Sequence, residues 1–147
     1  MAHSIADQVA SYPLAAYNFR VTVSDVAMGF AEVSGLAREF ETLTYRHGLS
    51  FIEGEEIVRF RLDKYVPLTL KRGVVKGLPQ LREWLEAGDK RPISVSLCDE
   101  AGDPVVTWRV QKAMPTKLEA PALQASAGEA AIESLTLMAA GITVETH

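Results

Sequence analysis

Apolar and polar residues alternate one by one through several short segments of this chain. In residues 17–24 every odd position is apolar and every even position is polar, and the same period of two recurs over 93–98 and 106–111. A period of two gives a β-strand one dry face and one wet face. The pattern therefore predicts a sheet that buries one face, and it limits the chain to a mostly β fold.

One segment has a different period. Its apolar residues are three and four positions apart, which predicts a helix over about residues 78–87 that packs one face on the sheet. Pro79 suits the first helical turn, and Gly88 suits the residue just past the end. A helix of about ten residues is too short to be stable alone, so it must pack. The predicted packing residues are Leu78, Leu81, Trp84 and Leu85.

Further strands are expected over 30–33, 57–62, 66–70 and 130–138, with a long loop over about 45–56. Pro115 and Pro121 are expected to bracket a connector, and Gly141 to break the last strand. We predict one domain over residues 1–147, with residues 1–12 as an N-terminal arm. With about seven strands, one helix and no strand–helix alternation, the predicted fold is a mostly β, antiparallel sandwich or barrel with one short packed α-helix.

The residues offer no candidate active site. Two of the three histidines, His3 and His147, stand near the ends of the chain, and the third, His47, lies in a turn-like context. No serine lies in a Gly-x-Ser-x-Gly motif. The single cysteine, Cys98, excludes a disulfide framework within the chain and a multi-cysteine zinc site. We therefore predict no catalytic residue, no metal site and no cofactor.

Charge and hydropathy exclude two further classes. The formal net charge of −4 argues against a dedicated nucleic-acid binder, which normally has a basic surface. No stretch approaches the ~20 consecutive apolar residues that a membrane span needs, so we expect no membrane insertion by this chain. Residues 1–11 lack a basic start followed by an apolar core, so they do not read as a signal peptide.

The polar sides of the strands have two interpretations. The first is an ordinary solvent face of an antiparallel sheet, which periodicity alone favours. The second is a hydrophilic wall around a water-filled lumen, formed when several subunits close into a ring. Such closure would also remove exposed sheet edges. The candidate lumen-facing residues are Arg20, Thr22, Arg59, Arg61, Thr69, Lys71, Thr107 and Arg109.

Several short motifs follow one another along nearly the whole chain. They are Tyr17-Asn18-Phe19-Arg20-Val21, Glu32-Val33-Ser34-Gly35-Leu36, Tyr45-Arg46-His47-Gly48, Leu68-Thr69-Leu70-Lys71-Arg72-Gly73, Leu97-Cys98-Asp99-Glu100 and Ala131-Ile132-Glu133. In order and spacing they resemble the tail tube proteins of contractile phages and of the related extracellular contractile injection systems.

This resemblance implies a structural protein rather than an enzyme. Subunits of that family form hexameric rings, which stack into an inner tube inside a contractile sheath; each ring shares one β-barrel around the lumen, and the helix lies outside. The implied partners are copies of the same chain in its own and adjacent rings, the sheath, and the spike and baseplate hub. Cargo protein or DNA would pass through the lumen without sequence-specific contacts. The residues of the implied ring-stacking loop are Tyr45, Arg46, His47, Phe51, Ile52, Glu53, Glu55 and Glu56.

Two finer expectations complete this interpretation. Residues 51–56 replace the Gly/Pro-rich stretch of many main-tube subunits, so the chain looks more like the variant subunits near the baseplate. Assembly is expected in the cytoplasm, before the tube becomes part of a phage tail or of a released particle. The alternative function is that of a small monomeric β-barrel that binds a ligand or acts as an enzyme, which should contain an apolar pocket with a few polar groups.

Overall fold

The computed structural model describes residues 14, 18–45, 56–74, 77–126 and 128–147. In these ranges the chain forms nine strands and one helix, in the following order. They are β1 (Phe19–Val23), β2 (Val26–Met28), β3 (Glu32–Ser34), β4 (Glu39–Tyr45), β5 (Glu56–Lys64), β6 (Val66–Gly73), α3 (Gln80–Ala87), β7 (Arg91–Cys98), β8 (Pro104–Glu119) and β9 (Ile132–Thr146). The predicted N-terminal arm, residues 1–12, lies outside the described residues.

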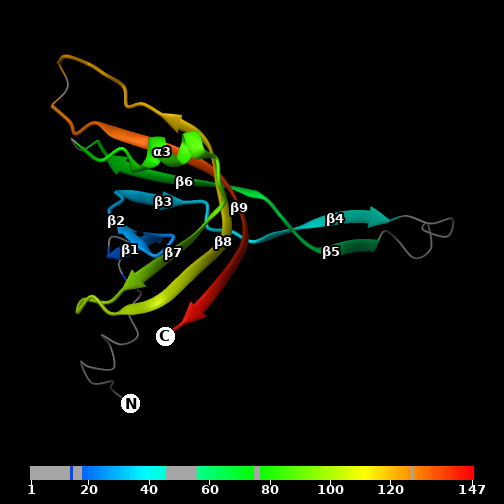
Figure 1. Ribbon diagram of the computed structural model, residues 1–147. Helices are drawn as coiled ribbons and strands as arrows, with labels where there is room; N and C mark the ends of the chain where they lie inside the picture. Colours follow the sequence, from blue (N-terminus) through cyan, green and yellow to red (C-terminus); the bar gives the residue numbers. More distant parts are fainter. Residues whose placement is uncertain (1–13, 15–17, 46–55, 75–76, 127) are drawn as a thin grey trace.

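Seven of the strands form one antiparallel sheet in the order β2-β1-β7-β8-β9-β6-β3, and β4 pairs with β5 in a separate two-stranded sheet. Figure 1 shows β4 and β5 projecting as an arm from one end of the body. The mostly β, antiparallel class with one short helix is confirmed. The strand count is higher than expected because Val26–Met28 has no alternation of apolar and polar residues, so the sequence pattern did not predict β2.

The seven-stranded sheet nearly closes on itself. Its two edge strands, β2 and β3, are each three residues long and are separated by only three residues in the sequence. Within that short link, the amide of Ala31 donates a hydrogen bond to the carbonyl of Lys71 at 2.7 Å. The long strands β8 and β9 curve around the body (Figure 1). Strand β2 pairs only with Val21–Val23 of β1, and β3 pairs only with Thr69–Lys71 of β6, so the rest of both strands has no ladder partner on that side. The removal of these edges by ring closure stays a prediction.

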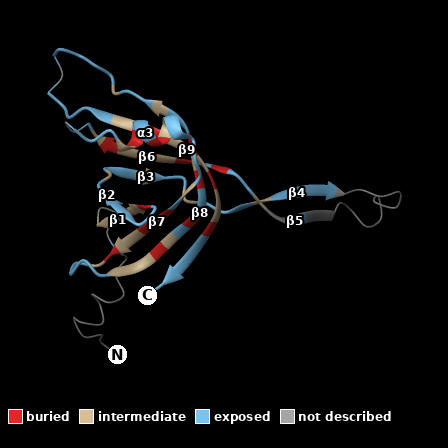
Figure 2. Ribbon diagram, in the orientation of Figure 1, coloured by how far each residue is buried: buried red, intermediate tan, exposed pale blue. Residues whose placement is uncertain are grey.

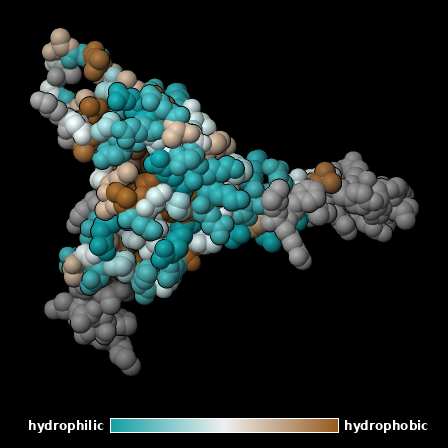
Figure 3. All heavy atoms as spheres, in the orientation of Figure 1, coloured by the Kyte–Doolittle hydropathy of each residue, from teal (hydrophilic) through white to brown (hydrophobic). Residues whose placement is uncertain are grey.

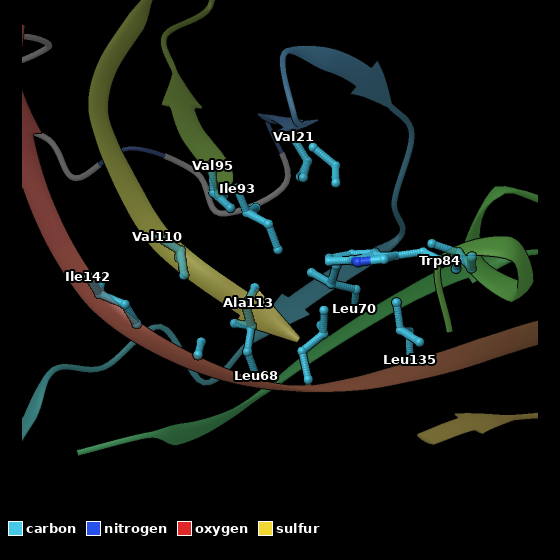
Figure 4. Packing of buried hydrophobic residues seen from close by; sticks show 14 of the residues in the cluster. Val21, Leu68, Leu70, Trp84, Ile93, Val95, Val110, Ala113, Leu135 and Ile142 are labelled. Carbon is cyan, nitrogen blue, oxygen red and sulfur yellow. The ribbon is translucent and has the colours of Figure 1, made fainter. Parts of the chain in front are cut away.

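The core lies on the inner face of this curved sheet, where the alternating apolar residues meet (Figure 2). Leu68, Leu70 and Leu135 come from β6 and β9, while Ile93 comes from β7 on the other side. In Figure 4 the Trp84 ring extends from α3 over Leu70, between the helix and the sheet. Each such side chain contributes about 1.5–3 kcal/mol when fully buried, so this cluster holds the sheet halves together.

The helix begins at Gln80, two residues later than predicted, and Leu78 does not belong to its packed face. Leu78 precedes the Pro79 N-cap and stays exposed, because only residues within the helix repeat on one face. Leu81 and Trp84 are buried and Leu85 is half-buried. Gly88 ends the helix in the left-handed conformation with φ 68°, as its place after the last turn suggests.

Strand β8 runs through the region predicted as a connector after Pro115. Pro115 pairs with Leu137, and a register shift follows between Pro115 and Lys117. A β-bulge is one of the few places where a strand accepts a residue without an amide hydrogen, so the strand continues past the proline. Similarly, β9 continues past Gly141, which takes a φ of 74° within the strand instead of ending it.

Candidate functional site

The polar residues of the main sheet share one surface, which we call the outer face. Its register is set by cross-strand pairs, so residues on different strands can be placed in rows. One row runs Arg20, Ser96, Thr107, Glu145, and the next runs Thr22, Ser94, Arg109, Thr143. Four of the predicted lumen-facing residues therefore lie close together on β1 and β8.

Two more predicted residues, Thr69 and Lys71, lie on the same face across the bend of the sheet. Thr69 pairs with Thr136 of β9 and Ser34 of β3, and Lys71 pairs with Glu32 of β3. The outer face thus runs from β1 through β7, β8 and β9 to β6 and β3. It lies back to back with the apolar core, and Figure 3 shows hydrophilic residues over much of the body in this view.

Two basic residues of the outer face, Arg109 and Lys71, have acidic partners on neighbouring strands. Arg109 Nε lies 2.7 Å from Glu145 Oε2, and Lys71 Nζ lies 3.2 Å from Glu32 Oε2. The hydrogen bond from Arg109, together with its positive charge, lowers the pKa of Glu145 below its ordinary value. Glu145 is therefore held ionised, and the face is polar while its charges largely cancel.

Hydroxyl groups connect the first row. Ser96 Oγ and Thr107 Oγ1 are 2.9 Å apart, and Thr107 Oγ1 is 2.8 Å from His147 Nε2. Thr107 is buried by these neighbours, so it supports the outer face more than it presents a free side chain. A hollow of about 640 Å³ lies beside this row and is lined in part by Arg20, Arg109 and Phe30.

Arg59 and Arg61 were also predicted to face the lumen, and this stays a prediction, but the two residues do not lie on the outer face. Both belong to β5, which pairs with β4 in the projecting hairpin instead of joining the main sheet. The guanidinium of Arg59 lies 4.2 Å from the centre of the Phe40 ring, a distance typical of a cation–π contact. Alternation along a strand identifies a polar face, but it cannot say which sheet the strand joins.

The predicted ring-stacking loop is only partly described. Tyr45 and Glu56 pair with each other at the outer ends of β4 and β5. The other predicted loop residues, Arg46, His47, Phe51, Ile52, Glu53 and Glu55, lie outside the described residues. The segment 46–55 therefore joins the two strands of the arm.

Sequence reasoning missed the role of Arg72. Its side chain is buried and donates three hydrogen bonds: from Nε to Glu133 Oε1 at 3.1 Å, from Nη1 to Gln80 Oε1 at 3.2 Å and from Nη2 to the Leu78 carbonyl at 2.8 Å. These bonds connect β6 with β9 and with the start of α3. The period of two could have predicted this, because Arg72 follows the inward Leu68 and Leu70 by four and two residues and so lies on the inward side of the strand.

The described ranges contain no cluster of three or more His, Cys, Asp or Glu residues that could hold a metal ion. Among the same residues, no helix has both the length and the apolar character needed to cross a membrane. The inside of the curved sheet is filled by the side chains of the core cluster, such as Leu68, Trp84 and Leu137. That filled interior does not suit the alternative of a ligand-binding barrel.

Comparisons with known proteins identify the family. The family model of the T4-like virus tail tube protein gp19 matches residues 15–143. The chain is similar to a chain of the sheath–tube complex of the PVC extracellular contractile injection system in its extended state, with 29% identity, a TM-score of 0.86, and coverage of 99% of this chain and 100% of the other. It is also similar to the tube-terminating cap of the anti-feeding prophage, with 34% identity, a TM-score of 0.83 and 93% of each chain covered.

A more distant likeness concerns the fold alone. Hcp1 from Flavobacterium johnsoniae has 12% identity and a TM-score of 0.58, over 89% of this chain and 97% of that one. No curated protein matches the chain. Because the family model spans most of the sequence, the chain belongs to the T4-like virus tail tube protein family, and it is a structural, non-enzymatic tail tube subunit of a phage tail or of a contractile injection system particle.

Proposed function

We propose that this chain assembles into hexameric rings that stack into an inner tube, with the outer face of its sheet toward the lumen. The carrying observation is that the outer face continues across six strands, directly behind the apolar core. A ring of such subunits, each with its outer face toward the ring axis, would enclose a hydrophilic channel without exposing any core residue.

The chemistry of the outer face supports passage of cargo instead of its capture. Hydroxyl groups alternate with ion pairs such as Arg109–Glu145 and Lys71–Glu32, so the surface has few strong unmatched charges in the described residues. Matched charges weaken long-range attraction to a passing polyion. Cargo protein or DNA would therefore move along the lumen without sequence-specific binding.

The projecting arm supports a role in stacking. The loop that joins β4 and β5 contains Phe51 and Ile52, and the two strands that it joins project from the body (Figure 1). We infer that this loop, residues 45–56, contacts the neighbouring ring. Its departure from the Gly/Pro-rich pattern also supports a position near the baseplate.

Further partners follow from the solved relatives. One relative was solved within a sheath–tube complex and another within a tube-terminating cap. By this likeness the chain would contact a contractile sheath around the tube, and a spike and baseplate hub at its end. Rings would assemble in the cytoplasm before the tail or particle is released.

Electron microscopy of the purified protein tests the proposal. We expect rings and stacked tubes from the unaltered chain, while replacing Phe51 and Ile52 by Ser should leave rings that do not stack. The matched control replaces the exposed Val144 by Ser and should stack normally. Persistently monomeric particles at high concentration would refute the tube assembly, and normal tubes from the Phe51/Ile52 variant would refute the role of the loop alone.

A further inference from the structure

The hollow of about 640 Å³ beside the first row of the outer face has a lining suited to an anion, and we call it the outer-face hollow. Strands β1, β7 and β8 line it with residues whose side chains donate hydrogen bonds: Arg20, Thr22, Ser94, Ser96, Thr107 and Arg109. A chain with a formal net charge of −4 therefore places two arginines and four hydroxyl groups around one concave part of its surface. Positive charge and convergent donors are what an oxyanion requires.

Arg20 brings a positive charge to this hollow. It is exposed, and its neighbour in the row on β7 is Ser96, which has no charge. Strand β2 pairs only with Val21–Val23 of β1, so no residue of β2 stands beside Arg20 in the ladder. Among the residues that the structure describes, Arg20 forms no ion pair, whereas Lys71 on the same face lies 3.2 Å from Glu32. The charge of Arg20 is therefore available to an anion from solution.

Arg109 also keeps free donors, although it pairs with Glu145. That carboxylate accepts a hydrogen bond from Nε at 2.7 Å, and the terminal nitrogens Nη1 and Nη2 have no partner among the described residues. The side chain is 54% exposed, so these nitrogens can reach a second anion. A guanidinium group carries most of its N–H donors on the terminal nitrogens.

The hydroxyl groups can direct a further donor into the hollow. Ser96 Oγ lies 2.9 Å from Thr107 Oγ1, which lies 2.8 Å from His147 Nε2. When His147 Nε2 carries a proton and donates it to Thr107, the Thr107 hydroxyl donates to Ser96. The half-buried Ser96 hydroxyl is then free to donate to an anion. His147 thus determines whether this chain of hydroxyl groups can present a donor.

We propose that the outer-face hollow binds a phosphate group, held by Arg20 and by the terminal nitrogens of Arg109, with Ser96 as a further donor. The two arginines are two strands and two residues apart, about 12 Å between Cα atoms at ordinary sheet spacings, so they approach a bound group from two sides. A phosphate presents three acceptor oxygens and can use all of these donors at once, while a carboxylate offers only two.

The phosphate group can belong to a free anion in solution or to the backbone of a nucleic acid in the lumen. A phosphate contact contains no information on base sequence, so the site agrees with cargo that passes without sequence-specific contacts. All the residues named belong to one chain, so the site goes beyond the proposed assembly and does not depend on it. Asp25 of the β1–β2 turn lines the same hollow, and its negative charge should weaken binding.

An NMR titration of the unassembled full chain with pyrophosphate, at low ionic strength, tests the site. We expect saturable shifts of the Arg109 Nε–H, the Ser96 amide and the His147 ring, with Nε2 of that ring protonated in the bound state. Arg20→Gln should weaken binding by at least about tenfold, because it removes a charge-assisted contact. Asp25→Asn should tighten it.

The matched control is Lys71→Gln, which removes the same charge from the same face but outside the hollow, and it should change the affinity by less than about twofold. Equal weakening by Arg20→Gln and Lys71→Gln, or no saturable shift at the hollow, would overturn the site.

A second probe, a short single-stranded oligothymidylate, distinguishes the two sources of phosphate. Binding that is tighter than that of pyrophosphate and is lost in Arg20→Gln assigns the site to a nucleic-acid backbone, and the reverse order assigns it to a free anion. Electron microscopy scores assembly separately. Tubes from a chain that binds no phosphate would refute the site alone, and phosphate binding by a chain that forms no rings would refute the assembly alone.

Discussion

Replacing Arg72 by Met should destabilise the fold far more than the same change at its neighbour Lys71. Met keeps an unbranched apolar stem but removes the three hydrogen bonds to Glu133, Gln80 and the Leu78 carbonyl. It also leaves the carboxylate of Glu133 in a site where only 19% of its side chain is exposed.

The magnitude follows from that burial. Removing one partner of a buried ion pair costs about 3–5 kcal/mol, because the other charge is left uncompensated. Glu133 retains some contact with water, so we expect the lower end, about 3 kcal/mol. For a chain of this size such a loss corresponds to a fall in Tm of about 6–12 °C. Lys71 pairs with Glu32 while both side chains are largely exposed, and Lys71→Met should therefore cost about 1 kcal/mol or less.

The assay is urea unfolding of the unassembled protein, followed by tryptophan fluorescence, since Trp84 lies in the core. A second variant, Arg72→Met with Glu133→Leu, tests the cause. It removes both charges, so it should recover most of the stability lost in the single variant. Equal losses for Arg72→Met and Lys71→Met would refute the reasoning, as would a double variant that is less stable than Arg72→Met.

Two further predictions concern a close backbone approach and two exposed carboxylates. Gly35→Ala would place a Cβ against the Pro67 carbonyl oxygen at a φ of 93°, and it should lower the free energy of unfolding by at least about 2 kcal/mol. Gly102 also has a positive φ but open space around it, so Gly102→Ala should cost only about 1 kcal/mol. Urea unfolding of the two variants measures this difference. Hydrogen bonds from Arg91 and Arg109 lower the pKa values of Asp89 and Glu145, respectively. The stabilisation from each pair is therefore fully present above the pKa of the carboxyl group in the unfolded chain. It is lost as the pH falls through the lower pKa of the folded state. In an NMR titration Arg109→Gln should raise the pKa of Glu145 and leave that of Asp89 unchanged; an unmoved Glu145 would contradict the assigned cause.

Local patterns predicted the strands well because they report directly on burial. The alternation over 17–24 predicted β1, and the alternating segments 93–98 and 106–111 predicted β7 and part of β8, with a turn between them. That turn is closed by the Asp99 side chain, which accepts hydrogen bonds from the amides of Ala101 and Asp103 at 3.0 and 2.9 Å. Such signals lie within a few residues of one another, so a single sequence contains them.

Pairing between distant strands could not be predicted in the same way. The period of two gives Arg59 and Arg109 the same polar character, but only the pairing of β5 with β4 removes Arg59 from the outer face. Arg72 was missed for a related reason. A charged residue at an inward position is acceptable only when distant partners satisfy it, and Glu133 is 61 residues away in the sequence.

The pairing of β1 also fixes an order of events during synthesis. Phe19 pairs with Leu97, and Val23 pairs with Ile93, so the first strand made must wait for about seventy more residues before its partner β7 exists. Until then β1 can pair only with β2, and the arm hairpin and the β3–β6 ladder form apart from it. The edge strands β2 and β3 thus connect β1, which is made early, with β6, whose other neighbour β9 is made last. Both edges of the main sheet thus lie near the start of the chain, but the sheet is complete only after β8 and β9 have been synthesised.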